Sequence, residues 1–188
     1  MAKAGYHHGS LRVAILETAA AQIATDGVDA VTLRGLARRA GVSHAAPAHH
    51  FGDRKGLLTA LAAEGFDLLA EELARADSEF REVAVAYVRF ALEHPGHFAV
   101  MFRGDLLHAD DPDLGAARTR AGDVLRTGVG QLPADRRGGD PGDAQLAAWS
   151  LVHGFASLWL DGALAGSALV RDDEPELIAR RLANILFA

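Results

Sequence analysis

Cysteine is absent from this chain of 188 residues, which excludes a disulfide framework and any metal site built on thiolates. No Gly-x-Ser-x-Gly, P-loop or dinucleotide-binding fingerprint occurs, and the His-Glu-x-x-His motif of zinc enzymes is missing. These absences remove the enzyme classes whose chemistry depends on such motifs. We therefore expect a protein that is not an enzyme and that uses no cofactor or metal.

The nine histidines leave one alternative to that expectation, a metal-dependent helical enzyme. His94 and His97 are three residues apart, but the Pro-Gly pair between them interrupts the helical face that two metal ligands would share. His49 and His50 are adjacent, so their side chains would point about 100° apart on a helix. Neither pair favours a metal site.

The first ten residues, MAKAGYHHGS, lack the apolar core of a signal peptide, so we expect a cytoplasmic protein. One long stretch, 144–170, is almost wholly apolar. It nevertheless contains His153, Asp161 and three glycines, and it lacks flanking aromatic and basic anchors. This composition favours a helix buried inside a protein over a membrane span, and we expect no membrane partner.

Positive charge is scarce overall, since the formal net charge is −6 and lysine occurs only at Lys3 and Lys55. Its distribution still favours a nucleic-acid partner. Residues 1–55 carry seven Lys and Arg against four Asp and Glu, a net charge of +3, whereas the remaining residues carry twelve against twenty-one, a net charge of −9. A basic amino-terminal part on an acidic remainder directs one end of the molecule toward phosphates.

The stretch 32–55, TLRGLARRAGVSHAAPAHHFGDRK, has the pattern of a helix-turn-helix. Thr32 can cap a short helix with apolar residues at helical spacing, and Gly41 ends that helix. Ser43 is placed to cap a second short helix, with Pro47 in its opening turn. The second helix of such a unit can enter the major groove of DNA, although a helical hairpin inside a bundle has the same spacing.

Apolar residues recur at helical spacing along the rest of the chain and predict an all-α fold. Two kinds of signal end predicted helices: glycines such as Gly27, and the Pro-Gly pair at 95–96. A polar loop rich in glycine and proline is expected over 131–143. The predicted helices are 10–26, 32–40, 43–49, 53–76, 78–94, 97–103, 113–129, 144–165 and 174–187.

The predicted helix 144–165 is apolar on two sides. One stripe consists of Leu146, Trp149, His153, Ala156, Leu160 and Ala163. The other consists of Val152, Phe155 and Trp159. Such a helix needs a core on one side and a further cover on the other, and a second subunit is the simplest cover, with an internal helix of a monomer as the alternative. The residues expected at a homodimer interface are Val152, Phe155, Trp159, Leu182 and Leu186.

The order of these motifs resembles the TetR family of transcriptional regulators. In that family a long first helix precedes the reading unit, and a Tyr-x-His-Phe-x-x-Lys segment leads into helix four. Here the segment reads AHHFGDRKGLL: His50 and Phe51 match, Ala48 stands in place of the family's Tyr, and Arg54 stands in place of its Lys. Trp149 followed by His153-Gly154 resembles the Trp…His-Gly signature of a TetR-family carboxy-terminal domain, and PGHFAVMF resembles that family's short helix six.

The resemblance implies a three-helix helix-turn-helix DNA-binding head over 8–55 and a helical effector-binding and dimerisation body over 56–188. A homodimer would bind a palindromic operator in double-stranded DNA. The residues expected to hold phosphates are Thr32, Arg34, Ser43 and either Lys55 or Arg54. The residues expected to face base edges or thymine methyl groups are His44, Ala45 and His49.

The resemblance also implies a small-molecule effector that is bound in the body and changes the affinity for DNA. Large apolar or amphipathic side chains on the body helices predict a mostly hydrophobic ligand, and we expect a repressor that the ligand releases. The alternative is a helical ligand-binding protein with a degenerate head, which the missing Tyr at Ala48 favours. The expected pocket residues are Phe66, Leu69, Tyr87, Phe98, Met101, Phe102, Trp149 and His153.

Overall fold

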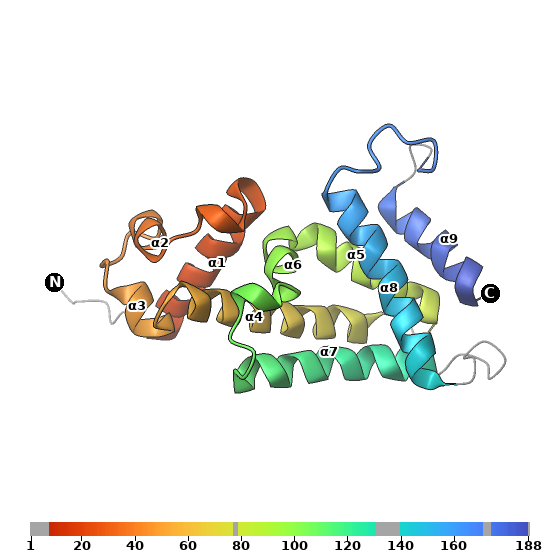
Figure 1. The fold of residues 1–188 in the computed structure, drawn as a ribbon, viewed down its shortest axis with the longest axis horizontal. Helices are drawn as coiled ribbons and strands as arrows, with labels where there is room; N and C mark the ends of the chain where they lie inside the picture. The colour runs from red at the N-terminus through yellow and green to blue at the C-terminus, as the bar shows by residue number, and fades with distance from the viewer. Residues whose placement is uncertain (1–7, 77–78, 131–139, 171–173, 188) are drawn as a thin grey trace. The chain divides into compact units, whose positions relative to one another are not determined.

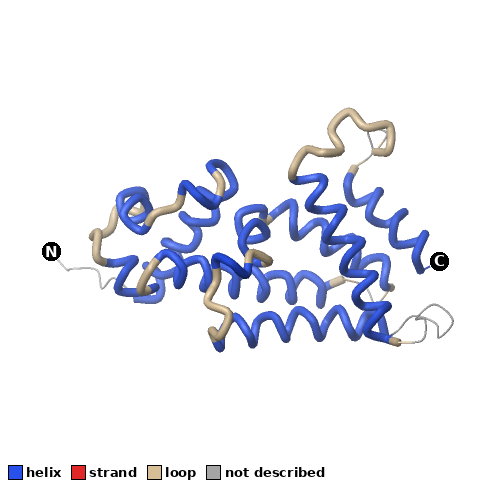
Figure 2. Tube along the Cα trace, viewed as in Figure 1, coloured by secondary structure: helices blue, strands red, loops and turns tan. Residues whose placement is uncertain are grey.

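A computed structural model describes residues 8–76, 79–130, 140–170 and 174–187. Throughout these residues the backbone forms helices joined by turns, with no strand, which confirms the predicted all-α fold (Figure 2). The α-helices are α1 (His8–Asp26), α2 (Leu33–Arg39), α3 (Ala46–Phe51), α4 (Arg54–Arg75), α5 (Phe80–Glu93), α6 (Pro95–Met101), α7 (Pro112–Gly130), α8 (Pro141–Leu160) and α9 (Pro175–Phe187). Two short 3₁₀ helices are η1 (Val28–Ala30) and η2 (Gly104–Leu106).

The chain divides into two compact units. The first, here called the head unit, consists of Met1–Gly65 and His94–Ala117, and the second, the body unit, consists of Phe66–Glu93 and Arg118–Ala188. The head unit therefore contains α6 as well as α1, α2 and α3. The functional boundary expected between residues 55 and 56 concerns activity rather than packing, and it stays a prediction.

The head unit is built on α1, whose inward residues are those that the periodicity indicates. Ile15, Ala19 and Ile23 are buried, and the helix ends where Gly27 adopts a φ of +81°. α1 packs against α6. At this contact a Cβ atom placed on Gly96 would lie 2.1 Å from the carbonyl oxygen of Ala20, so only glycine allows the two backbones to approach so closely.

The body unit has its core between α5, α8 and α9, which lie side by side (Figure 1). Val85 and Val88 of α5, Phe155 of α8, and Ile178 and Ala179 of α9 form one buried cluster. Burial of a valine, isoleucine or phenylalanine side chain stabilises the fold by about 1.5–3 kcal/mol. Hydrophobic packing in this cluster is therefore the main interaction that holds these three helices together.

Ion pairs at the edge of this core join α5 to its neighbours. Both carboxylate oxygens of Glu82 accept hydrogen bonds from Arg180, at 2.9 and 2.8 Å, and this lowers the pKa of Glu82. Arg89 bonds Glu176 of α9 and Glu72 of α4. The pairs are partly exposed, so each contributes at most about 1 kcal/mol, and their chief effect is to set the register of the helices.

Among the helices that differ from the predicted bounds, α6 and α8 do so for local reasons. α6 begins at Pro95 rather than at His97, because proline suits the first turn of a helix, where its missing N–H is not needed. α8 ends at Leu160 rather than at residue 165, because Gly162 has a φ of +69° and its N–H bonds the carbonyl oxygen of Trp159. Residues 131–139 of the predicted polar loop lie outside the described residues. Pro141–Asp143, which were also predicted as loop, form the first turn of α8 instead, with Asp140 as its N-cap.

None of the helices in the described part of the chain is both long enough and apolar enough to cross a membrane, including α8.

Candidate nucleic-acid interface

The predicted helix-turn-helix is formed by α2, α3 and the turn between them. Thr32 caps α2 as predicted, since its Oγ1 accepts a hydrogen bond from the Gly35 N–H at 3.1 Å. Gly41 ends α2 with a φ of +67°, and the N–H of Val42 donates to the Ala37 carbonyl oxygen at 3.0 Å. α3 then packs against both α2 and α1, so its position in the head unit is fixed (Figure 1).

The start of α3 differs from the prediction. Ser43 does not cap this helix, which begins at Ala46. The N–H of Ala46 bonds the Ser43 carbonyl oxygen at 3.0 Å, and this holds His44 and Ala45 in a turn ahead of the helix. Pro47 fills the first turn as predicted. The side chains of His44 and Ala45 are consequently presented on an exposed turn rather than on a helix face.

The basic residues around this unit fall into two groups. Arg34, Arg38 and Lys55 are exposed, and none of them forms a hydrogen bond or ion pair with another described residue. Arg39 differs, because its Nη2 lies 3.1 Å from Oδ2 of Asp26. Arg38 was not among the predicted contact residues, although its position four residues after Arg34 puts it on the same side of α2.

Arg54 belongs to neither group. Its Nε donates to the Val31 carbonyl oxygen at 3.0 Å and its Nη2 donates to the Val28 carbonyl oxygen at 2.8 Å, and Asp29 lies 3.7 Å away. The guanidinium thus ties the start of α4 to the segment between α1 and α2. The sequence allowed either Lys55 or Arg54 as the phosphate contact. Because Nε and Nη2 of Arg54 are bonded to backbone carbonyl groups, we favour Lys55.

These positions predict different effects for two neighbouring substitutions. Lys55→Ala should leave stability within about 0.5 kcal/mol, because an exposed and unpaired side chain is removed. Arg54→Ala should lower the free energy of unfolding by about 1–3 kcal/mol, because two partly buried carbonyl groups lose their donors. Urea unfolding of both variants measures this. Equal stability of the two variants would contradict the internal role of Arg54.

Asp53 caps the start of α4. Its Oδ1 accepts a hydrogen bond from the Gly56 N–H at 2.7 Å, which is the main cause of a lowered pKa for this carboxyl group. His108 lies 3.7 Å from the same oxygen and adds to the effect. The carboxylate is therefore ionised at neutral pH and is held at the start of α4.

Three of the predicted pocket residues form a hydrogen-bonded chain in the body unit. The Tyr87 hydroxyl oxygen lies 3.0 Å from Nδ1 of His153, and Trp149 Nε1 donates to the same oxygen at 3.3 Å. Tyr87 is buried, and burial raises the pKa of its hydroxyl group, whereas burial lowers the pKa of the His153 ring. Nδ1 of neutral His153 can thus accept a hydrogen bond from the Tyr87 hydroxyl group.

The other five predicted pocket residues are divided between the two units. Phe98, Met101 and Phe102 belong to the head unit, and Phe66 and Leu69 belong to the body unit. All of these except Phe102 are buried. Each is therefore accounted for as a packing residue of its own unit, and their participation in one ligand pocket stays a prediction.

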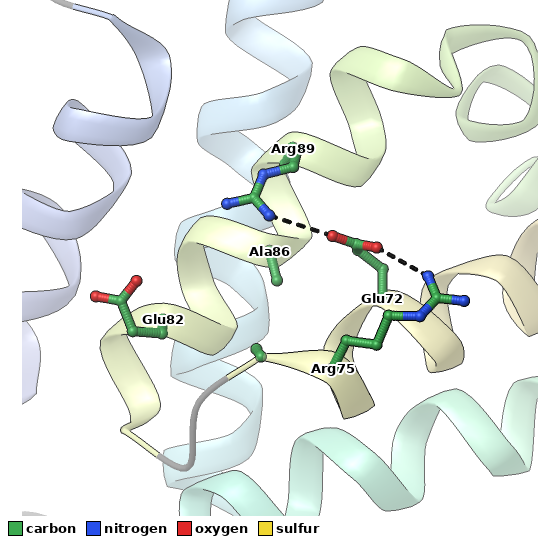
Figure 3. A pocket seen from close by; sticks show the side chains of 6 residues that line it. Glu72, Arg75, Glu82, Ala86 and Arg89 are labelled. Carbon is green, nitrogen blue, oxygen red and sulfur yellow. Dashed lines mark hydrogen bonds and ion pairs between the residues drawn. The ribbon is translucent and has the colours of Figure 1, made fainter.

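A cavity of about 310 Å³ lies in the body unit and is lined by none of the predicted pocket residues (Figure 3). Glu72 on its wall accepts hydrogen bonds from Arg89 at 3.3 Å and from Arg75 at 3.2 Å. Glu82 accepts a hydrogen bond from Arg180. Its charges are thus paired within the protein. The full lining is Glu72, Arg75, Ala76, Glu82, Ala86 and Arg89.

The two apolar stripes predicted on α8 are present, but the stripe expected at a subunit interface packs inside the protomer. Val152 and Phe155 were expected at a subunit interface, and both are buried within the protomer because α5 and α9 cover that side. Trp159 and Leu182 pack against the same cluster, and the side chain of Leu186 lies outside the described part.

The exposed apolar residues lie elsewhere on the same two helices. Leu146, Trp149 and Leu160, from the first stripe of α8, are 57%, 37% and 37% exposed, and Leu177 and Ile185 of α9 are 49% and 78% exposed. We call these five residues the α8–α9 apolar face. We therefore expect a second subunit to bind the α8–α9 apolar face, and not to bind at Val152 and Phe155.

Histidine and carboxylate side chains do not gather into a metal site in the part of the chain that the structure describes, where no group of three or more potential ligands occurs. His97 instead bonds Glu64 through Nε2 at 3.1 Å, next to the ring of His94.

Comparison with known proteins identifies the fold and the family. Residues 15–61 match the model for bacterial regulatory proteins of the tetR family, and residues 80–184 match the model for the tetracyclin repressor-like C-terminal domain. Comparison with curated proteins found no match.

Several solved structures are similar over almost the whole chain. A protein of unknown function from Rhodococcus sp. RHA1 is 36% identical with a TM-score of 0.77, over 98% of this chain and 97% of that one. The TetR family transcriptional regulator PfmR from Thermus thermophilus is 26% identical with a TM-score of 0.62, over 92% and 96%. NalD of Pseudomonas aeruginosa, the secondary repressor of the MexAB-OprM multidrug efflux pump, is 20% identical with a TM-score of 0.59, over 95% and 94%, and this likeness shows the fold alone.

The carboxy-terminal match covers more than half of the chain, and the amino-terminal match coincides with the helix-turn-helix built from α2 and α3. The chain therefore belongs to the TetR family of bacterial regulatory proteins, a non-enzyme class whose fold implies DNA-binding transcriptional regulation.

Proposed function

We propose that this regulator is a homodimeric repressor that binds a palindromic operator and is released by a small, mostly hydrophobic effector. The observation that carries the DNA-binding part is the set of unpaired cations at the helix-turn-helix. Arg34, Arg38 and Lys55 have no internal partner among the described residues, whereas the charges of the body are largely paired. Unpaired arginine and lysine side chains beside a reading helix are the groups that hold phosphates.

The proposed contacts follow from the observed positions. Arg34 and Lys55 neutralise phosphates, and the exposed hydroxyl groups of Thr32 and Ser43 can add hydrogen bonds to phosphate oxygens. The turn before α3 presents His44 and Ala45 to base edges. Ala45 is small enough to contact a thymine methyl group, and His44 can bond acceptors in the groove.

The proposed second subunit covers the α8–α9 apolar face. Leu177 and Ile185 of α9 are exposed, whereas Ile178 and Ala179 of the same helix are buried. Leaving such a face in water costs free energy in proportion to its apolar area, and a two-fold related copy of the same face is the simplest complement. Two heads related by a two-fold axis require an operator with the same symmetry.

The effector part of the proposal rests on the Tyr87–Trp149–His153 chain. Trp149 and His153 are partly exposed large rings, and they carry hydrogen-bonding groups at the edge of an apolar surface. An effector bound there would be mostly apolar and would be oriented by one or two hydrogen bonds. Since a bacterial repressor meets its operator on the chromosome, we place the protein in the cytoplasm.

The test is selection of DNA by the purified protein. Fragments of a bacterial genome with high GC content are incubated with wild-type protein and with the variant Arg34→Ala/Lys55→Ala, and retained fragments are sequenced. We expect the wild type to enrich fragments that share a two-fold symmetric sequence and the variant to enrich none. Retention of no fragment by the wild type would support a ligand-binding protein with a degenerate head.

A further inference from the structure

Permanent positive charge is scarcer at the DNA-facing surface than the sequence indicates. Five Lys and Arg residues lie between positions 32 and 55. Arg39 is paired with Asp26, and Arg54 is bound to the carbonyl groups of Val28 and Val31. Only the three others, Arg34, Arg38 and Lys55, remain for phosphates in each head.

Histidines occupy the places where further cations would be expected. His44 is exposed on the turn before α3 and His49 is exposed in the last turn of α3, and neither forms a hydrogen bond or ion pair with another described residue. The neighbouring Ala48 is also exposed and has no polar atom. Of the two histidines in the last turn of α3, His49 is the exposed one and His50 is partly buried, so His49 is the better placed to donate a hydrogen bond to a DNA backbone.

The charged groups on the neighbouring elements leave this imidazole available. Its own helix contributes His50, whose ring centroid is 5.6 Å away in an edge-on arrangement. α1 contributes Arg12, which lies over the Phe51 ring, and exposed Glu17, while α2 contributes Arg34, Arg38 and the paired Arg39. The start of α4 contributes Lys55 and Asp53, the latter already held by Gly56 and His108.

We infer that His49 binds a DNA phosphate as an imidazolium ion, so that operator binding by this protein takes up protons near neutral pH. Histidine is the side chain that changes charge in this range, and an adjacent phosphate favours its protonated form. The inference rests on the proposed DNA-binding function. The protein should therefore bind its operator more tightly at pH 6 than at pH 8.

The experiment measures the dissociation constant of one selected operator fragment between pH 6 and pH 8 at constant salt. For wild type, each bound proton should contribute up to about a tenfold gain in affinity per pH unit, and one proton is expected per head. His49→Gln should flatten this dependence, since glutamine can still donate a hydrogen bond but cannot take up a proton in this pH range. Far-UV circular dichroism at each pH confirms that the variants are folded.

Two further variants make the test decisive. His49→Arg carries a permanent charge, so its affinity should be high at pH 8 and nearly independent of pH. His108→Gln removes another histidine of the head unit, one that faces Asp53, and should keep the wild-type pH dependence. Proton uptake that is unchanged in His49→Gln, or affinity without pH dependence in wild type, would overturn the inference. Absence of DNA binding at every pH would instead count against the proposed function.

Discussion

Gly96→Ala should strongly destabilise the head unit. The new Cβ atom would lie 2.1 Å from the carbonyl oxygen of Ala20 and 3.0 Å from its Cα, so two backbones rather than flexible side chains would have to separate. Overpacking of this kind costs about 1–3 kcal/mol, and a backbone clash belongs at the upper end of that range. Urea unfolding followed by circular dichroism measures the loss.

Two other glycines provide matched controls. A Cβ atom on Gly65 would meet the sulfur of Met101 at 2.7 Å, and a methionine side chain can move, so Gly65→Ala should cost less than Gly96→Ala. Nothing lies within 4 Å of a Cβ atom on Gly122 in α7, so Gly122→Ala should stabilise the protein by roughly 0.5–1 kcal/mol through helix propensity. If Gly96→Ala proves as stable as wild type, α1 and α6 are not packed as described.

Leu177→Glu/Ile185→Glu should convert the protein from a dimer to a monomer that remains folded. Both side chains are about half exposed or more in the protomer, so the charges cost little there, but a second copy of the α8–α9 apolar face would bury them unpaired. Loss of the second head should weaken operator binding by roughly 10²–10⁴-fold. Analytical ultracentrifugation and a DNA titration measure the two effects.

Phe155→Ala separates the interface from the core. Phe155 is 7% exposed and packs against Val85, Val88 and Ile178, so its truncation should lower the free energy of unfolding by about 3–5 kcal/mol. A stable Phe155→Ala monomer would return this residue to the subunit interface. A Leu177→Glu/Ile185→Glu protein that is still a dimer would show that the second copy binds elsewhere.

Local signals in the sequence predicted the parts of the interface that depend only on nearby residues. The Thr32 cap and the Gly41 turn each involve partners within five positions, and both were found as predicted. The predicted Ser43 cap is absent for an equally local reason. Its carbonyl group forms a turn with Ala46, and this turn competes with the capping geometry that its hydroxyl group would need.

Contacts between distant residues could not be predicted in the same way. Arg54 bonds Val31 and Val28, which are 23 and 26 residues away, so nothing near it in the sequence distinguishes it from Lys55. The two apolar stripes of α8 are similar in composition. The choice between them depends on α5 and α9, which cover Val152 and Phe155 and leave Leu146 and Leu160 exposed.

The most direct test of DNA-binding regulation is a competition titration with the fragment that the protein itself selects. Wild-type protein is bound to the labelled fragment at a fixed salt concentration. It is then displaced either by the unlabelled fragment or by a fragment with the same bases in scrambled order. The mass of the protein–DNA complex is measured separately. We predict two protomers per fragment and a preference of at least about 10³-fold for the selected sequence. Equal displacement by the scrambled sequence, or a complex with one protomer, would contradict the account.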